Sequence, residues 1–424
     1  MPYLHFDEAK RGIRSAVLPF LAGTGIGRIL FIVDFSGRIR VVLWGPGTDR
    51  DSDISAALAA ACGDWWTGQI LRIADLDSVN SKLYNDAWEL APREAETDHL
   101  RVLARHRNRT AWFRKSNPPW RAPSEGPAII VFYSFKGGLG RSTLLASFAI
   151  QQAQAGARVC VIDFDLDSPG LGTILSADSE GRTARWGVVD FLLENPGPQV
   201  PLDDYYHRCD RVSGAGQIIV FPAGSLDDMY ADKLSRVDFE VDSGSGPGKI
   251  ESLLSRIRDD LSPSWILIDA RTGISEQAGH LLSGCAHAHV LLGTNQEQSW
   301  QGLSRVLDRL GRERLIDGQP QGDTILVQAM VPNGEAGRIA RELFLGRAET
   351  EYENCYYSAV EEEEAWDISD KGLEDAPHIP VTFEYEPRLA SYKDITEVEE
   401  ALAGPDYSAF SHRVTNRFIP ETEE

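Results

Sequence analysis

The sequence predicts an α/β protein with a mostly parallel, doubly wound sheet, preceded by a small α+β module. The first observation is a series of short, almost wholly apolar runs after residue 128, such as PAIIVFYSF and SWILIDAR. They alternate with helical segments, as strands buried on both faces of a parallel sheet do. The second is the Pro-rich stretch NPPWRAPSEGP at residues 117–127, which is typical of a linker. We therefore expect an N-terminal module at 1–116, a linker at 117–127 and a large domain at 128–424.

Length and composition are those of a globular protein with two or three domains. The chain has 424 residues, of which 42% are hydrophobic and 25% charged, and this excludes wholesale disorder. The sequence has no run of about 18 apolar residues, and its N-terminus lacks an apolar signal-peptide core. The five cysteines lie far apart and in no metal-ligand spacing. We therefore expect a cytoplasmic protein with no membrane span, no disulfide framework and no zinc site.

The N-terminal module reads as a mixture of strands and helices. ILFIVDF and IRVVLW are β-rich runs separated by Ser36 and Gly37, which predicts a hairpin. By apolar spacing, DISAALAAACGDWW and the stretch around LRVLARH are expected to be helical. These residues indicate no function for the module.

The large domain begins with a strand at PAIIVFYSF and a helix at STLLASFAIQQAQAG, joined by a glycine-rich turn. RVCVIDFDLD is the next buried strand and ends in carboxylates. SWILIDAR, HVLLGT and TILVQAMV are expected to be further strands, separated by helices. This order predicts a parallel sheet that is covered by helices on both faces.

Charge is distributed unevenly along the chain. The net charge is −22, and the part from Leu345 to the end carries −15 of it, from 21 acidic and 6 basic residues. Such a chain repels nucleic acid on average. Residues 101–124, by contrast, hold seven Arg or Lys and no acidic residue. Nucleic-acid binding through residues 101–121 is therefore possible, but we favour docking of Trp112, Phe113 and Trp120 on one domain.

The strongest chemical signal is FKGGLGRST, from Phe135 to Thr143, between an expected strand and an expected helix. Glycines let backbone amides approach phosphate oxygens closely, and a helix N-terminus favours negative charge. Ser142 stands where a phosphate-binding loop supplies a Mg²⁺ ligand. Phe135 and Arg141 depart from the general GxxxxGK[ST] pattern. The glycines of this loop are Gly137, Gly138 and Gly140.

Two carboxylate motifs follow at expected strand ends. Asp163 lies 22 residues after Arg141 and precedes Asp165 by two residues, in VIDFDLDSPGL, and Asp269 ends the strand WILIDARTG. With the early Lys136, these motifs resemble the deviant Walker A ATPases of the ParA/MinD group. FYSFKGGLGRST, FPAGSLDDMY, IDARTGISE and IPVTFEYEPRLA are most similar to a branch with a KGGVGR-type loop, in which arginine is usual and Leu139 replaces valine. The resemblance covers roughly residues 128 to 400.

The motifs and the resemblance together assign roles to these residues. The cofactor-binding loop runs from Lys136 through Gly137, Gly138, Leu139, Gly140, Arg141 and Ser142 to Thr143. Arg141 is expected on the β- and γ-phosphates, because its planar fork gives bidentate contacts. Ser142 is expected to bind Mg²⁺, with Asp163 and Asp269 holding its water shell. The resemblance implies that Asp165 orients the attacking water and that Lys136 reaches the nucleotide of a second protomer.

Several other residues have a structural and a functional interpretation. We expect Asp167 to cap a turn or helix, and Arg271 to form an ion pair more readily than to sense nucleotide. His280, His287 and His289 surround Cys285, but packing is favoured over a metal cluster. Asn333 and Tyr385 to Pro387 are equally consistent with adenine contacts and with packing.

The sequence therefore predicts an ATPase of low turnover that binds Mg²⁺ and ATP, dimerises on ATP and signals to an unidentified partner protein. Two alternatives stay open: a nucleotide-bound scaffold that does not hydrolyse ATP, and an ATPase loaded on nucleic acid. The partner and the role of the N-terminal module are not predicted.

Overall fold

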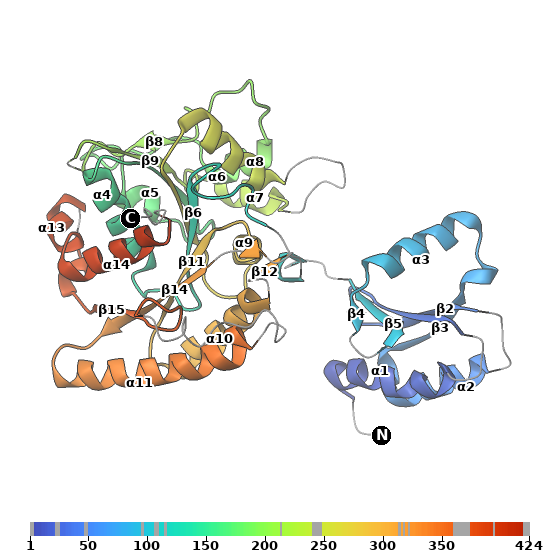
Figure 1. Cartoon of the computed structure of the whole chain (residues 1–424). Helices are drawn as coiled ribbons and strands as arrows, with labels where there is room; N and C mark the ends of the chain where they lie inside the picture. Colours follow the sequence, from blue (N-terminus) through green and yellow to red (C-terminus); the bar gives the residue numbers. More distant parts are fainter. Residues whose placement is uncertain are drawn as a thin grey trace. The chain divides into compact units, whose positions relative to one another are not determined.

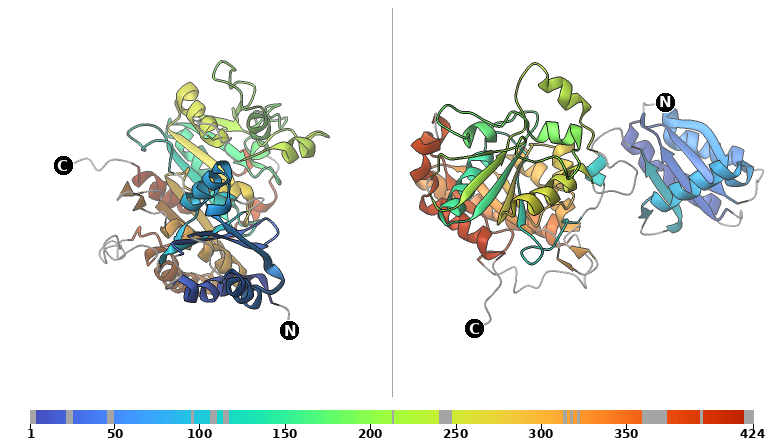
Figure 2. Two further views of the ribbon diagram at one scale, coloured as in Figure 1. Left: turned by 90° about the vertical axis from the view of Figure 1, so that its right-hand side faces the viewer. Right: turned by 90° about the horizontal axis from the view of Figure 1, so that it is seen from above.

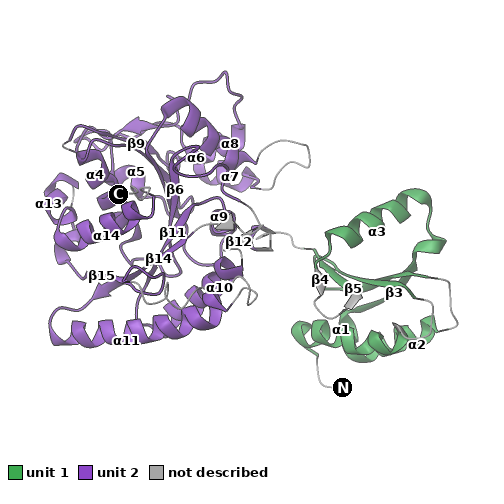
Figure 3. Ribbon diagram, viewed as in Figure 1, with its two compact units in different colours: residues 1–108 green, residues 109–424 purple. Residues whose placement is uncertain are grey.

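A computed structural model describes residues 4–21, 26–45, 50–94, 97–105, 110–113, 117–212, 214–239, 248–312, 315–316, 319–320, 323–358, 374–392 and 395–418. The chain divides into two compact units, Met1–Asn108 and Arg109–Glu424 (Figure 3). Among the described residues, no helix combines the length and the apolar character that crossing a bilayer requires.

The first unit is a five-stranded mixed sheet with helices on both faces (Figure 1). The strand order is β3-β2-β1-β5-β4. The hairpin expected at Ser36 and Gly37 is confirmed, because β1 and β2 pair antiparallel on either side of these residues. The elements are α1 (Phe6–Leu21), β1 (Arg28–Val33), β2 (Ile39–Trp44), α2 (Asp51–Cys62), β3 (Trp66–Arg72), α3 (Ser78–Leu90), β4 (Arg93–Glu94) and β5 (Thr97–Ala104).

One expected helix of this unit is wrong. LRVLARH begins inside β5, which pairs parallel with β1. Leu100 joins the core under α1 and α2, whereas Leu103 packs with the cluster under α3 on the other face. A strand covered on both faces carries apolar residues at successive positions, and this pattern resembled helical spacing.

The second unit contains an eight-stranded sheet in the order β15-β14-β11-β6-β10-β7-β9-β8. All neighbouring pairs are parallel except β8 with β9, so the predicted mostly parallel sheet is confirmed. The strands are β6 (Ala128–Ser134), β7 (Arg158–Phe164), β8 (His207–Arg208), β9 (Gln217–Phe221), β10 (Trp265–Ala270), β11 (Ala288–Gly293), β14 (Asp323–Val331) and β15 (Val381–Glu384). A separate short pair is formed by β12 (Leu315–Ile316) and β13 (Gln319–Pro320).

Helices cover both faces of this sheet (Figure 2). One core packs α4 and the C-terminal α14 against one face, and a second core packs α6, α8, α9, α10 and α11 against the other. The helices are α4 (Arg141–Gln154), α5 (Leu171–Ile174), α6 (Val188–Glu194), α7 (Tyr230–Arg236), α8 (Lys249–Arg256), α9 (Glu276–Leu281), α10 (Glu297–Arg312), α11 (Glu335–Tyr352), α13 (Glu399–Leu402) and α14 (Pro405–Asn416). The loops after the central parallel strands therefore meet at one edge of the sheet, where open α/β sheets bind ligands.

Candidate functional site

The glycine-rich loop connects the fully buried strand β6 to the N-terminus of α4. Gly138 and Gly140 have φ values of +76° and +81°, a region that favours glycine. A Cβ added at Gly137, Gly138 or Gly140 would meet no other atom within 4 Å, so the outer side of the loop is open. An open loop that leads into a helix N-terminus suits an anionic group.

Phe135, which replaces the first glycine of the general pattern, anchors the loop to α10. Its ring lies so close to Gly302 that a Cβ there would fall 1.9 Å from the Phe135 Cγ. The next residue, Lys136, lies half-buried, and its Nζ donates to Oε1 of Gln296 at 2.5 Å. Phe135 therefore has a packing role, and Lys136 lies on the side of the loop that faces the start of α10.

The three carboxylates expected at strand ends come together. Asp163 on β7 and Asp269 on β10 are partners in the parallel register of adjacent strands. Asp165 follows directly after β7. The exposed fractions are 1% for Asp163, 2% for Asp269 and 7% for Asp165. Three buried carboxylates require compensating charge or hydrogen bonds.

Arg141 supplies much of this compensation. Its Nε donates to Asp269, and its Nη2 donates to Oδ2 of Asp165 at 2.9 Å. Burial lowers the pKa of Arg141, but Asp269 and Asp165 outweigh burial, so the guanidinium stays charged. Its Nη1 is buried and has no hydrogen-bond partner among the described residues. Arg141, expected on phosphate, is therefore bound to carboxylates here and keeps one buried donor for a further acceptor.

Ser142 and Asp163 complete this cluster. The Ser142 hydroxyl donates to Oδ2 of Asp269 at 2.5 Å. Asp163 accepts hydrogen bonds from the amides of Gly170 and Leu171, both at 3.0 Å. Burial and the charge of Asp269 raise the pKa of Asp163 to about 7. Burial also raises the pKa of Asp269, although Arg141 opposes the shift.

Ser142 and Asp269 could bind Mg²⁺ only if other ligands, such as water and phosphate oxygens, completed the coordination shell. The described residues contain no group of three or more His, Cys, Asp or Glu side chains that could hold a metal ion. A hydroxyl and a carboxylate in contact, as in Ser142 and Asp269, are hard oxygen ligands. Mg²⁺ commonly uses one or two such ligands together with water and phosphate oxygens. Ser142 and Asp269 therefore fit a metal that arrives with a phosphate ligand.

A second arginine holds Asp165 from the other side. Nη1 of Arg271 lies 3.1 Å from Oδ1 of Asp165, and its Nε lies 3.1 Å from Oδ2 of Asp167. Gln277 also donates to Asp167, at 2.9 Å. The ion pair expected for Arg271 is confirmed, and Asp167 takes part in it instead of the expected cap. The sequence alone does not indicate that Asp165 and Asp167 are the partners of Arg271.

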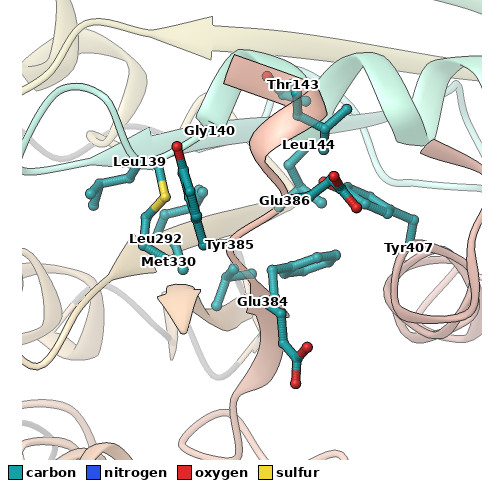
Figure 4. Close-up of a pocket in the computed structure, with 14 residues that line it drawn as sticks. Leu139, Gly140, Thr143, Leu144, Leu292, Met330, Glu384, Tyr385, Glu386 and Tyr407 are labelled. Atoms are coloured by element: carbon teal, nitrogen blue, oxygen red, sulfur yellow. The ribbon is translucent and has the colours of Figure 1, made fainter. Parts of the chain in front are cut away.

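Beside the loop lies a small pocket whose lining is mainly apolar and aromatic (Figure 4). Leu139 and Thr143 line it from the loop and α4, and Tyr385 and Glu386 line it from the segment after β15. Of the expected adenine contacts, Asn333 lies instead at a neighbouring hollow that also includes Tyr385. Residues that the sequence did not single out as ligand contacts also line the pocket, among them Met330, Phe383, Leu389 and Tyr407.

The basic stretch is divided between the two units: residues 101–105 belong to the first unit, and residues 110–113 and 117–124 belong to the second. Residues 106–109 and 114–116 lie outside the described residues. Nε1 of Trp112 donates to the Ser275 carbonyl at 2.6 Å. Trp120 is 5% exposed, and the Arg258 guanidinium lies 4.8 Å from its ring. The expected docking of these two tryptophans is confirmed, so their rings are not displayed for stacking on bases. The side chain of Phe113 lies outside the described residues.

His287 and His289, near Cys285, lie within the second unit. Nδ1 of His287 accepts from the Ile129 amide at 2.9 Å, and its Nε2 lies 2.8 Å from the Trp120 carbonyl. His289 is 1% exposed, within β11. Packing, as expected, accounts for His287, whereas the ring nitrogens of His289 are buried with no hydrogen-bond partner among the described residues.

Comparison with known proteins gives one family match and a set of distant relatives. The family described as the CobQ/CobB/MinD/ParA nucleotide binding domain matches residues 130–354. An iron-sulfur cluster carrier protein of Pseudomonas fragi is 26% identical over 261 residues, which cover 53% of this chain and 78% of that protein. The septum site-determining protein MinD of Helicobacter pylori is 27% identical over 180 residues, which cover 42% of this chain and 57% of that protein.

Solved structures are similar at lower identity. The cell division ATPase MinD of Pyrococcus furiosus has a TM-score of 0.44 and 17% identity, covering 68% of this chain and 99% of that one. A structure of pNOB8 ParA bound to nonspecific DNA has a TM-score of 0.43 and 15% identity, covering 69% of this chain and 99% of that one.

Proposed function

Because the chain belongs to the CobQ/CobB/MinD/ParA nucleotide-binding family, we propose that its second unit is an ATP-dependent switch. It binds ATP with Mg²⁺, dimerises in that state, signals to a partner protein and resets by slow hydrolysis. One observation carries the proposal. An open glycine loop, a buried arginine with an unused donor and a serine–aspartate pair converge at the N-terminus of α4.

The phosphates belong on the loop. Amides of residues 137–140 and the α4 N-terminus offer donors to a triphosphate. Nη1 of Arg141, the first residue of α4, is a buried donor with no hydrogen-bond partner among the described residues. To make a bidentate phosphate contact, Arg141 must break its hydrogen bond to Asp269 or the one to Asp165. The base and ribose belong in the pocket between Thr143 and Tyr385, whose lining is mainly apolar and aromatic.

Ser142 and Asp269 are the residues that would hold Mg²⁺, with Asp163 beside them. When bound, the ion neutralises charge on the phosphates and orients them. Two backbone amides fix the Asp163 carboxylate, so it cannot swing away from the cluster.

Asp165 is the group proposed to orient the attacking water, since it follows the β7 strand end at the open edge of the sheet. In this structure its two oxygens pair with Arg141 and Arg271, at 2.9 and 3.1 Å. If Arg141 turns to phosphate, Oδ2 of Asp165 becomes free to accept from water, while Arg271 keeps the carboxylate in place. Positioning of this kind accounts for most of the catalysis in phosphoryl transfer.

Lys136 is proposed to complete the site of a second protomer. Its ammonium donates to Gln296, just before α10, and among the described residues it pairs with none of the three carboxylates. A cation that arrives from a facing protomer would add charge stabilisation only after dimerisation.

A scaffold that binds ATP without hydrolysing it is the second candidate. The ion pair between Arg141 and Asp165 favours it, because this contact occupies the carboxylate that would orient water. Loading on nucleic acid is not proposed, since Trp112 and Trp120 are engaged within the second unit.

Calorimetry with ATP and Mg²⁺ tests the binding site. Arg141→Ala should weaken ATP binding roughly tenfold to a hundredfold, as expected for the loss of a charge-assisted contact of about 1.5–3 kcal/mol. Ser142→Ala should reduce the Mg²⁺ dependence of binding. Arg312→Ala, which removes an exposed pair with Asp308, is the matched control. Unchanged affinity in both site variants would reject the proposed site.

Phosphate release and light scattering separate switch from scaffold. The wild type should dimerise with ATP but not with ADP, and should release phosphate slowly. Lys136→Ala should bind ATP as a monomer, and Asp165→Ala should bind ATP without turnover. Nucleotide-independent mass together with no phosphate release would reject the switch and leave the scaffold.

A further inference from the structure

Helix α3 of the first unit packs one face on the sheet. Asp77 caps its N-terminus by accepting from the amides of Val79 and Asn80. On the inner face, Trp88 is 2% exposed and lies 5.4 Å from the ring of Trp44 on β2. The helix is therefore fixed to the sheet through its inner face, on the side opposite α1 and α2 (Figure 1).

The outer face of α3 is unusually apolar. Val79, Leu83 and Leu90 are 76%, 54% and 78% exposed. At about 100° per residue, their spacing of four and seven places them within an arc of about 40°. From Val79 to Leu90 this stripe runs about 17 Å, or three helical turns. Single exposed apolar residues are common, but an aligned series indicates an interaction surface.

A carboxylate lies in the middle of the stripe. Asp86 is one turn from Leu83 and one turn from Leu90, on the same side of the helix, and it is exposed. Its neighbours have partners, since Asn85 accepts from Trp44 and Glu89 lies 3.8 Å from Arg101. Among the described residues none forms a hydrogen bond or an ion pair with Asp86. The stripe thus combines apolar contact area with one unpaired negative charge.

We propose that this α3 face, made of Val79, Leu83, Asp86 and Leu90, docks an amphipathic helix of a partner protein. The partner helix carries apolar side chains at spacings of three and four, with a Lys or Arg placed to meet Asp86. A helix fits because a three-turn ridge of this kind packs into the groove of another helix. The basic residue is required because a carboxylate covered by apolar surface without a partner is strongly unfavourable.

The same charge argues against two other occupants. A second copy packed about the centre of the stripe would bring the two Asp86 carboxylates together at the contact, and like charges there oppose association. An anionic membrane surface is disfavoured because Asp86 and Glu89 border the apolar residues and Lys82 is the one basic residue of this helix.

The test uses the full chain and two designed helical peptides carrying a fluorophore. Both have leucine at i, i+4, i+7 and i+11; the first has lysine within the stripe and the second has glutamate at that position. By fluorescence anisotropy, the wild type should bind the lysine peptide at least about tenfold more tightly, which is a modest value for one opposite-charge pair at an apolar contact. Asp86→Lys should reverse the preference, and Leu83→Gln with Leu90→Gln should abolish binding of both peptides.

Asp53→Lys, an exposed charge change on α2, is the control and should keep the wild-type preference. Circular dichroism melts verify that each variant folds. Equal binding of the two peptides, no binding of either, or an unchanged preference in Asp86→Lys would overturn the proposal. So would a nucleotide-free dimer, or binding to anionic vesicles, that is lost when Leu83 and Leu90 become glutamine, since the occupant would then be a second copy or a membrane.

Discussion

Replacing Arg141 with methionine should destabilise the second unit, and magnesium should partly restore it. The substitution keeps an unbranched side chain of similar length but removes the cation from a cluster in which Asp269 and Asp165 are 2% and 7% exposed. Arg271 remains 3.1 Å from Asp165, and Ser142 still donates to Asp269. The uncompensated charge is therefore centred on Asp269.

The size of the effect follows from this burial. Removing one partner of a buried ion pair costs about 3–5 kcal/mol. Because two contacts remain, we expect the lower end, about 3 kcal/mol. In a unit of this size each kcal/mol lowers the melting temperature by roughly 2–4 °C, so a fall of roughly 6–12 °C is expected. A divalent cation at Asp269 would replace part of the lost positive charge.

Differential scanning calorimetry in chelator and in magnesium measures this effect, because it can separate the transitions of the two units. Arg256→Met is the matched control: Arg256 is 9% exposed and pairs with Asp260, away from the glycine loop. Its loss should destabilise the same unit equally in both buffers. The reasoning is refuted if Arg141→Met melts within about 2 °C of the wild type, or if magnesium raises both variants by the same amount.

Three further expectations follow from single contacts. Arg271→Gln should lower kcat with little change in KM, because it frees Asp165 without touching nucleotide contacts; Arg271→Lys should recover part of kcat, and equal losses in both variants would contradict a positioning role. Burial lowers the pKa of His289 to about 4, because the folded protein disfavours the charged imidazole. The folded state therefore keeps its full stability above the ordinary pKa of 6.5 and loses stability as the pH falls from 6.5 towards 4. Urea unfolding should show a loss of about 3 kcal/mol over that range in the wild type, and a shallower pH dependence in His289→Leu; parallel curves would rule this out. Gly302→Ala should displace the Phe135 ring, cost about 1–3 kcal/mol and weaken ATP binding, and Phe135→Ala in the same chain should relieve the clash; absence of that rescue would show that the contact is unimportant.

The strands and the loop could be predicted because their signals are local. Each central strand is a short apolar run, and the glycine loop follows the first of them directly. Asp163 and Asp269 could be placed together because parallel strands end at one edge of the sheet. Strand β5 was missed because its two covered faces remove the alternation that marks a half-buried strand.

The partners of the site residues could not be predicted, because they depend on tertiary contacts. Nothing in the order of residues indicates that Arg141 would bind Asp269 and Asp165, or that Asp167 would share Arg271. Met330 reaches the pocket from an irregular part of β14 with φ of +58°, and Tyr407 reaches it from α14. Neither residue belongs to a motif.

The pocket beside the loop has a mixed origin along the chain. The glycine loop and the carboxylates lie between residues 130 and 354, the part that matches the family. Phe383, Tyr385 and Tyr407, which line the pocket, come from the C-terminal segment beyond that part. If the pocket takes the base as proposed, the contacts that select the base come in part from a segment outside the family match. Substitutions in that segment would then change base preference without altering the glycine loop.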